Sequence, residues 1–187
     1  MKVLVVVDMQ KDFITGPLGN DDTRRIVPNV VAELKRAAAK DTLIIFTKDT
    51  HEENYMETLE GKNLPVPHCI RDSAGWYICD EVMDAYLETK DLWDGSEILP
   101  YAIDRMIEKP TFGSIDFQNV LCNLDNVEEI TLMGVCTGIC VLSNAILAKA
   151  TLPEVPVNVI ESCCACVTPE THKTAIEAMK LCQINII

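Results

Sequence analysis

The chain has 187 residues, of which 48% are hydrophobic and 24% are charged, and its formal net charge is -13 at pH 7. This size and composition predict a single domain, residues 1–187, whose core is large enough to need no disulfide framework. The strong negative charge disfavours nucleic acid and anionic membrane surfaces as partners. No apolar run approaches the roughly 20 residues of a membrane span, and the N-terminus is unlike a signal peptide, so we expect a cytoplasmic protein.

Strand-like and helix-like segments alternate along the chain. Asp21 and Asp22 are the predicted N-caps of the first helix. A polar stretch at 48–75 shows no periodicity, and loops of this length in compact domains are usually functional. A turn-rich link at 89–105 leads to a short apolar segment at 106–108. In chain order the pattern predicts a strand at 2–7, a helix at 23–40, a strand at 42–47, helices at 76–88 and 116–124, a strand at 129–133, a helix at 140–150, a strand at 155–160, a helix at 169–181 and a strand at 184–187.

Four polar residues stand where predicted strands end. The alternation of buried-type strands with helices predicts an α/β fold with a parallel sheet, in which ligands bind beyond the carboxyl ends of the strands. We therefore expect Asp8, Asp49, Lys109 and Cys140 to converge at one edge of that sheet. Cys140 also falls in the first turn of a predicted helix, where the macrodipole and backbone N–H groups favour a thiolate and can hold an oxyanion.

The nine cysteines are an odd number and include one Cys-x-x-Cys spacing, from Cys163 to Cys166. No second pair at zinc-site spacing accompanies Cys163, Cys164 and Cys166, so packing explains this cluster. We expect most of the cysteines to be small buried side chains in a reducing compartment. His172, near the start of a predicted helix, is expected to cap or pack rather than bind a metal.

Three motifs, in this order, resemble those of the cysteine hydrolases of the isochorismatase-like superfamily. They are Val-Val-Asp8-Met-Gln-Lys-Asp-Phe13, Lys109-Pro-Thr-Phe-Gly-Ser and Gly-Val-Cys-Thr-Gly-Ile-Cys140-Val. The resemblance covers nearly the whole chain. It implies a three-layer, Rossmann-like fold with a mostly parallel, six-stranded sheet flanked by helices.

Two further motifs, Asp49-Thr-His51 and Pro-His68-Cys, resemble the metal site of the nicotinamidase branch of this superfamily. The resemblance implies that Asp49, His51 and His68 bind one divalent ion. Zn²⁺ is the first candidate, with Fe²⁺ or Mn²⁺ as alternatives. Glu60 is a further candidate ligand, because some relatives recruit a loop carboxylate. The ion is expected to orient a pyridine ring rather than to act as the Lewis acid for hydrolysis.

The resemblance also implies roles in catalysis. Cys140 would attack an amide carbonyl, and Asp8 would take the thiol proton and pass it to the leaving amine. Lys109 would pair with Asp8 and lower the pKa of the thiol further. The oxyanion hole would be formed by the backbone N–H groups of Cys136 and Cys140, with a cis peptide bond between Val135 and Cys136.

The expected activity is hydrolysis of a small-molecule amide, nicotinamide, to nicotinate and ammonia through a cysteine thioester. The alternatives are another cysteine hydrolase of the superfamily, acting on N-carbamoyl or ureido compounds or resembling isochorismatase, and a non-catalytic ligand-binding member. Phe13 matches a substrate-pocket position of the family, whereas Phe112 and Trp76 are expected in the core. Pro65 stands where an aromatic residue is frequent, which leaves the substrate less defined than the reaction. A homo-oligomer is compatible with the sequence.

Overall fold

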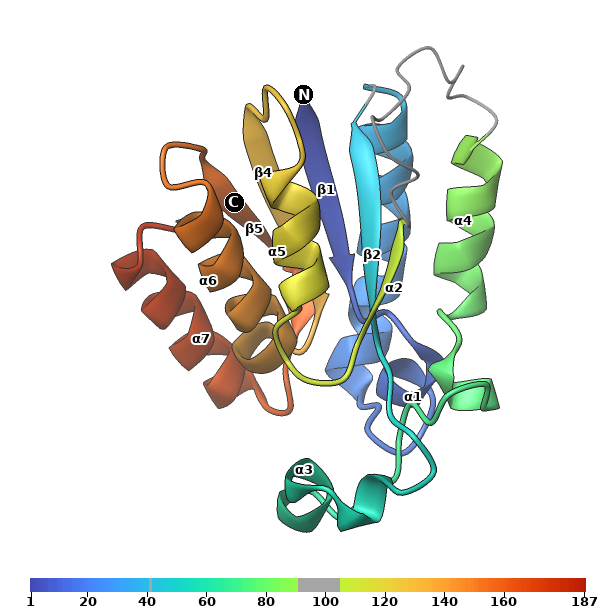
Figure 1. Cartoon of the computed structure of the whole chain (residues 1–187). Helices are drawn as coiled ribbons and strands as arrows, with labels where there is room; N and C mark the ends of the chain where they lie inside the picture. The colour runs from blue at the N-terminus through green and yellow to red at the C-terminus, as the bar shows by residue number, and fades with distance from the viewer. Residues whose placement is uncertain (41, 91–104) are drawn as a thin grey trace.

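The computed structural model describes residues 1–40, 42–90 and 105–187 (Figure 1). In this part of the chain six strands form one parallel sheet in the order β3-β2-β1-β4-β5-β6. The predicted α/β, Rossmann-like fold is confirmed. The strands are β1 (Lys2–Val7), β2 (Leu43–Asp49), β3 (Met106–Lys109), β4 (Glu129–Val135), β5 (Val157–Ala165) and β6 (Asn185–Ile186).

Helices cover both faces of the sheet and make the outer two of three layers (Figure 1). On one face α2 (Asp21–Ala38) packs against β5, β2 and α4 (Asp80–Lys90). On the other face α6 (Leu142–Thr151) lies between α5 (Ile115–Cys122) and α7 (Pro169–Leu181). Short helices α1 (Lys11–Ile14) and α3 (Leu59–Asn63) lie beyond the carboxyl ends of the strands. In the described ranges, no helix is both long and apolar enough to span a bilayer.

The central strand β1 is buried on both of its faces. Val5 pairs with Ile45 of β2 on one side and with Leu132 of β4 on the other, and all three side chains are 0% exposed. A strand flanked on both sides and covered by helices on both faces has no solvent-facing position. This explains why the valine-rich run at 2–7 shows no polar alternation.

One glycine allows β4 to approach β1 next to the end of that strand. Gly134 has φ +124°, and a Cβ placed there would lie 2.0 Å from the carbonyl oxygen of Val7. Only glycine combines this backbone angle with this approach. Gly134 therefore fixes the distance between the residues that follow β1 and those that follow β4.

The first long helix is capped by a different residue from the one predicted. Asn20 is the N-cap of α2, because its side chain accepts a hydrogen bond of 2.9 Å from the Thr23 amide while its own amide donates to the Thr23 hydroxyl at 3.0 Å. This is a reciprocal capping box. Asp21 and Asp22 are in the first helical turn instead, where their charge complements the macrodipole.

Several predicted boundaries also shift. Strand β2 continues to Asp49, because the buried polar side chains of Lys48 and Asp49 end the apolar pattern before the strand ends. Strand β5 continues to Ala165 beyond two exposed polar residues, Glu161 and Ser162, which interrupt its apolar pattern. The helix predicted at 76–88 begins only at Asp80. The stretch 48–75 contains the 3₁₀ turn η1 (Tyr55–Glu57) and α3, and a second 3₁₀ turn, η2 (Ala74–Trp76), ends it. The predicted link at 89–105 is mostly outside the described residues.

All nine cysteines are free thiols. Six of them are buried, as expected for small apolar side chains. Cys136 is partly buried, and Cys122 and Cys182, at the C-terminal ends of α5 and α7, are exposed.

Candidate active site and metal cluster

The four polar residues at the predicted strand ends meet at the carboxyl edge of the sheet. Asp8 follows β1, Asp49 and Lys109 are the last residues of β2 and β3, and Cys140 lies in the turn after β4. None of the four is more than 5% exposed. The prediction that these residues converge is confirmed.

Lys109 is the centre of this group. Its Nζ lies 2.7 Å from Oδ2 of Asp8, 3.3 Å from Oδ1 of Asp49 and 3.4 Å from Sγ of Cys140. The other oxygen of Asp8 accepts a hydrogen bond of 2.7 Å from the hydroxyl of Thr47. Buried charges persist only when they are paired, and here one ammonium group compensates two carboxylates. The geometry holds a thiol, a carboxylate and an ammonium group in mutual contact.

The pKa of the Cys140 thiol is shifted in the opposite direction from the one expected. Burial raises the pKa of Asp8, and the Lys109 ammonium opposes that rise. Burial and the facing Asp8 carboxylate raise the pKa of Cys140 well above its ordinary value, against the influence of Lys109. The expectation of a depressed thiol pKa is therefore wrong, because it counted the cation and the helix terminus but not desolvation and the carboxylates. The resting site holds a neutral thiol beside a carboxylate that can accept its proton.

Cys140 is presented by a π-helical turn, Thr137–Val141, rather than by the first turn of the predicted helix. The amides of Ile139 and Val141 both donate to the carbonyl of Cys136, at 3.0 and 3.2 Å. The implied cis peptide bond between Val135 and Cys136 is present. Single π-turns of this kind occur frequently at functional sites.

Asn144 ties this turn to the loop after β3, and sequence reasoning missed it. Its side-chain amide donates to the carbonyl of Cys140 at 2.8 Å and to that of Phe112 at 3.1 Å, and its oxygen accepts from the Ser114 amide at 3.0 Å. Asn144 is 0% exposed. The signal was the one amide side chain in a mainly apolar helical segment.

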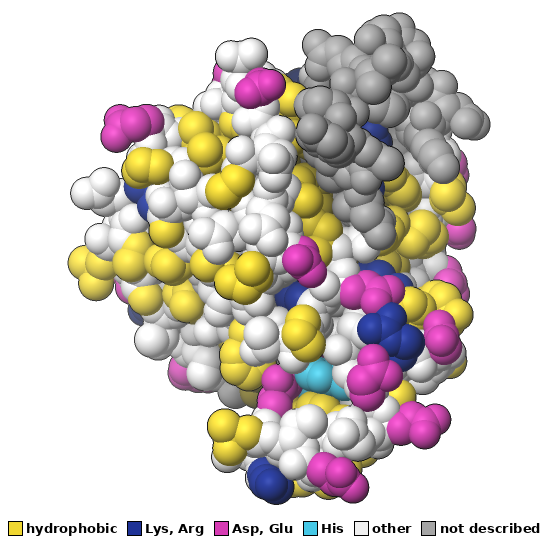
Figure 2. Space-filling model, in the orientation of Figure 1, with side chains coloured by type: hydrophobic (Ala, Val, Ile, Leu, Met, Phe, Trp, Pro, Cys, Tyr) yellow, Lys and Arg dark blue, Asp and Glu magenta, His cyan; other side chains and the backbone are white. Residues whose placement is uncertain are grey.

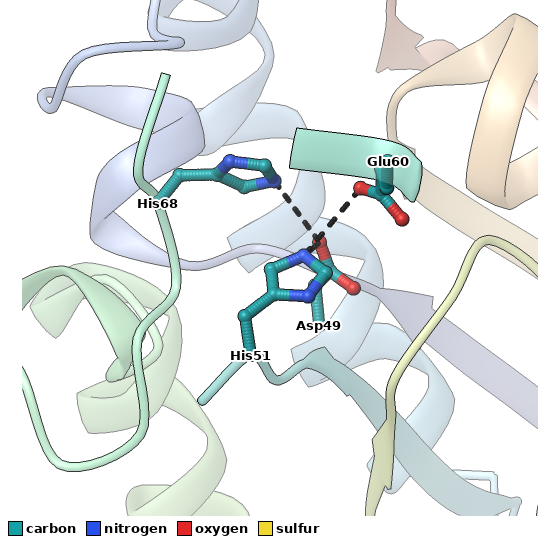
Figure 3. Close-up of side chains that lie close together, drawn as sticks. All are labelled: Asp49, His51, Glu60 and His68. Atoms are coloured by element: carbon teal, nitrogen blue, oxygen red, sulfur yellow. Dashed lines mark hydrogen bonds and ion pairs between the residues drawn. The ribbon is translucent and has the colours of Figure 1, made fainter. Parts of the chain in front are cut away.

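A cluster of four side chains, Asp49, His51, Glu60 and His68, lies directly beside Lys109. One ligand atom from each lies within 4.8 Å of the others, and the side chains point toward a common centre (Figure 3). Oδ2 of Asp49 lies 3.2 Å from Nε2 of His51 and 3.4 Å from Nε2 of His68. Oε1 of Glu60 lies 3.5 Å from Nε2 of His51. We call these residues the four-ligand cluster.

The donor set of the four-ligand cluster fits a divalent transition metal. Nδ1 of His68 lies 2.8 Å from the carbonyl oxygen of Val66, to which it can only donate, so the Nε2 lone pair faces the cluster. A hydrogen bond of this type orients metal-binding imidazoles in proteins. Two imidazoles with one or two carboxylates suit zinc, iron or manganese. Figure 2 shows one histidine side chain reaching the surface low on this face, between acidic side chains.

Gln10 holds the backbone of Asp49 from both sides. Its amide nitrogen donates to the carbonyl oxygens of Asp49 and Trp76, both at 2.8 Å, and its amide oxygen accepts from the Asp49 N–H at 2.7 Å. Gln10 is 0% exposed, so its side chain forms these hydrogen bonds out of contact with solvent. Sequence reasoning quoted Gln10 within a motif but gave it no role.

The segment that carries His68 is held in a similar way by Asp12. Oδ2 of Asp12 accepts a hydrogen bond of 2.7 Å from the amide of Cys69. A Cβ at Gly75 would lie 2.0 Å from Oδ1 of Asp12, so glycine is required for the loop to close over this carboxylate. The loop at 48–76 is thus anchored through its backbone, which fixes the imidazoles it carries.

The thiol and three members of the four-ligand cluster face the same cavity, of about 160 Å³. Cys140, Asp49, Glu60 and His68 line it, and Phe13 lies in its wall, as predicted. Phe112 also lines the cavity and is 43% exposed, so its expected place in the core is wrong. The remaining lining is mainly apolar, from Leu18, Leu64, Ile139 and Val167.

Two other aromatic or imidazole residues lie where they were expected. Trp76 is buried, and its indole N–H donates to the Thr50 hydroxyl at 2.8 Å. His172 lies outside the four-ligand cluster and packs against the π-helical turn that carries Cys140, with Nδ1 2.8 Å from the Thr137 hydroxyl.

Comparison with known proteins gives a family and a set of similar folds. A family model described as the isochorismatase domain matches residues 2–96 and 95–187. No curated protein matches the chain significantly in sequence. The fold is similar to that of the pyrazinamidase/nicotinamidase of Streptococcus mutans, with 22% identity, a TM-score of 0.81 and coverage of 100% of both chains.

Two further solved structures are similar over nearly their full length. The pyrazinamidase of Pyrococcus horikoshii in complex with zinc has 23% identity and a TM-score of 0.73, with coverage of 100% of this chain and 98% of that one. The N-carbamoylsarcosine amidase of Thermoplasma acidophilum has 18% identity and a TM-score of 0.72, with coverage of 100% and 95%.

Proposed function

The chain belongs to the isochorismatase domain family, and from that membership we propose that it is an amidohydrolase that converts nicotinamide to nicotinate and ammonia. One observation carries the proposal. The buried thiol of Cys140 and three members of the four-ligand cluster, Asp49, Glu60 and His68, line a single, mainly apolar cavity of about 160 Å³. This combination suits a flat aromatic ring with a polar ring atom at one side and a carboxamide at the other.

The nucleophile in the proposed reaction is Cys140. Its thiol attacks the amide carbonyl while Asp8 takes the thiol proton. The raised pKa of Asp8 supports this step, because a carboxylate with a higher pKa is a stronger base. Asp8 then protonates the leaving amine, ammonia departs, and a thioester remains on Cys140.

The second half of the reaction reverses the roles. Asp8 deprotonates a water molecule, which attacks the thioester and releases the acid and the free thiol. Lys109 keeps Asp8 oriented throughout through its contact of 2.7 Å. The backbone N–H groups of Cys136 and Cys140 are the proposed donors to the tetrahedral oxyanion.

The four-ligand cluster would hold one divalent ion, for which we propose zinc, with iron(II) or manganese(II) as alternatives. When bound, the ion would supply a coordination position for the ring nitrogen, which orients the carboxamide toward the thiol. The zinc named in the Pyrococcus horikoshii relative supports this assignment. Phe13 and its apolar neighbours in the cavity would pack against the faces of the ring.

A panel of three amides tests the substrate class. Purified protein is assayed for ammonia from nicotinamide, from benzamide and from an N-carbamoyl amino acid, and the metal content of the same sample is measured. We expect about one ion per chain and a preference for nicotinamide over benzamide. Hydrolysis of the N-carbamoyl compound by a metal-free protein that leaves nicotinamide intact would assign the chain to the alternative amidohydrolases.

A further inference from the structure

Two further thiols lie beside the π-helical turn that carries Cys140. Cys136 and Cys166 are the first residues after β4 and β5, and the last residues of these strands, Val135 and Ala165, are paired in the parallel register. Adjacent strands lie about 4.8 Å apart. Disulfides span Cα–Cα distances of about 4.4–6.8 Å. The sheet therefore brings these two cysteines, 30 positions apart in the sequence, within bonding range.

The two side chains lie close enough to influence each other. Cys136 lowers the pKa of Cys166 to about 5, although burial acts in the opposite direction, and Cys166 in turn raises the pKa of Cys136. The Thr171 hydroxyl and the backbone N–H groups of Gly138 and Val167 add further donors. The lowered pKa favours the thiolate form of Cys166, beside the thiol of Cys136.

Cys136 and Cys166 line different cavities. Cys166 lines a cavity of about 430 Å³ between α2, the end of β5 and the start of α7, whose walls also include Asn29 and His172. Cys136 lines the cavity of about 160 Å³ that contains Cys140. A small oxidant can therefore meet Cys166 without entering the cavity proposed for the substrate.

We propose that Cys136 and Cys166 are an oxidation site at which a hydroperoxide converts the two thiols into a disulfide. The Cys166 thiolate attacks the outer oxygen of the O–O bond, which gives a sulfenic acid and releases water or an alcohol after proton uptake. The Cys136 sulfur then attacks the sulfenic sulfur, and its proton leaves with the hydroxyl group as water. Two thiols lose two electrons in total, and the peroxide gains them.

Formation of the sulfenic acid at Cys166 makes the later attack by Cys136 easier. The thiolate of Cys166 holds the proton on Cys136 and raises its pKa. Once Cys166 is a sulfenic acid that acceptor charge is gone, so the Cys136 thiol ionises more easily and can resolve the intermediate.

Cys140 is a poorer target for the same oxidant in the resting protein. Burial and the Asp8 carboxylate raise the pKa of Cys140, so it is held as a neutral thiol. Because thiolates react with peroxides and thiols do not, oxidation begins at Cys166. The pair thus intercepts oxidant beside the nucleophile.

The disulfide would also slow the enzyme, and this consequence depends on the proposed function. An S–S bond of about 2.05 Å draws the two sulfur atoms closer than hydrogen-bonded thiols stand. Cys136 carries a proposed oxyanion donor on its backbone, and loss of one such donor costs roughly 10²–10³ in rate. We expect at least a tenfold loss of amide turnover on oxidation, reversed by a thiol reductant.

The test uses the intact chain, treated with hydrogen peroxide, alkylated to cap free thiols and mapped by peptide mass spectrometry without reduction. We expect a peptide cross-linked between Cys136 and Cys166, absent after dithiothreitol and absent in Cys166→Ala. Cys163→Ala, in β5 three residues before Cys166, is the matched control and should keep the cross-link. Cys166→Ala should keep its activity before oxidation and lose the reversible component of inactivation.

The peptide mapping tests the oxidation site, and the amide assay tests the proposed function, so each can be refuted without the other. Oxidation of Cys140 or of other cysteines with no cross-link between Cys136 and Cys166 would overturn the oxidation site, whatever the protein hydrolyses. A cross-link that forms in full while turnover is unchanged would overturn the effect on activity. A protein that forms the cross-link but hydrolyses none of the amides in the panel would refute the proposed function and leave the oxidation site standing.

Discussion

Lys109 and Asp49 are joined by a contact of 3.3 Å between Nζ and Oδ1. The second oxygen of Asp49 faces the imidazoles of His51 and His68. One carboxylate therefore belongs both to the ion-pair network around the thiol and to the four-ligand cluster. The nucleophile and the proposed metal site are thus parts of one buried electrostatic unit, and predictions at either part must consider the other.

Asp8→Asn should increase ionisation of the Cys140 thiol while it reduces turnover. The Asp8 carboxylate raises the pKa of Cys140, so removing its charge lowers that pKa and increases the thiolate fraction at pH 7. Alkylation of Cys140 by iodoacetamide should become faster. Turnover should fall about 10²–10⁴-fold, because an amide cannot shuttle the proton. Turnover close to that of wild type would require another base.

Removing the metal should affect substrate binding more than the thiol. A chelator, or His51→Ala, should lower the metal content, raise KM for nicotinamide and reduce turnover. The alkylation rate of Cys140 should change less than KM does, because Asp8 and Lys109 remain in place. Metal analysis, steady-state kinetics and alkylation of the same samples provide the three readouts.

His172→Ala is the control for the metal prediction, since this imidazole lies outside the four-ligand cluster. It should keep its metal. A His51→Ala protein with unchanged metal content and unchanged KM would show that the four-ligand cluster does not bind the metal.

Gln10→Leu should destabilise the protein and weaken metal binding together. The substitution leaves three buried backbone groups of Asp49 and Trp76 without their partner. A buried polar group left unsatisfied costs about 1–3 kcal/mol. We expect Tm to fall by about 5–10 °C, with a lower metal content after dialysis.

The control for this prediction is Gln118→Leu, a half-buried glutamine on α5 away from the site. Its Tm should stay within about 2 °C of wild type, as surface substitutions usually do. If the two variants lost the same stability and bound metal equally well, Gln10 would have no special role in holding Asp49.

The sequence predicted that four polar residues meet, because each of them stands at or just past the end of a predicted strand. Strands of a parallel sheet end at a common edge, so Asp8, Asp49, Lys109 and Cys140 could be placed together without coordinates. The resemblance added the imidazoles at His51 and His68, whose loop has no periodicity of its own.

The remaining features depend on distances that a sequence does not contain. The direction of the Cys140 pKa shift is set by burial and by a carboxylate 132 positions earlier in the chain. Gln10 and Asn144 act through backbone atoms of distant segments, so no side-chain pattern marks their partners. The Cys136–Cys166 contact follows from the register of β4 on β5, which periodicity does not specify.

The most direct measurement is ammonia release from nicotinamide by the wild-type protein and by Cys140→Ala, assayed side by side after circular dichroism has shown that both are folded. The account predicts steady ammonia release by the wild type and less than about one part in a thousand of that rate for Cys140→Ala, because the covalent route is lost. Retention of a larger fraction by Cys140→Ala, or no release by the metal-loaded wild type, would contradict it.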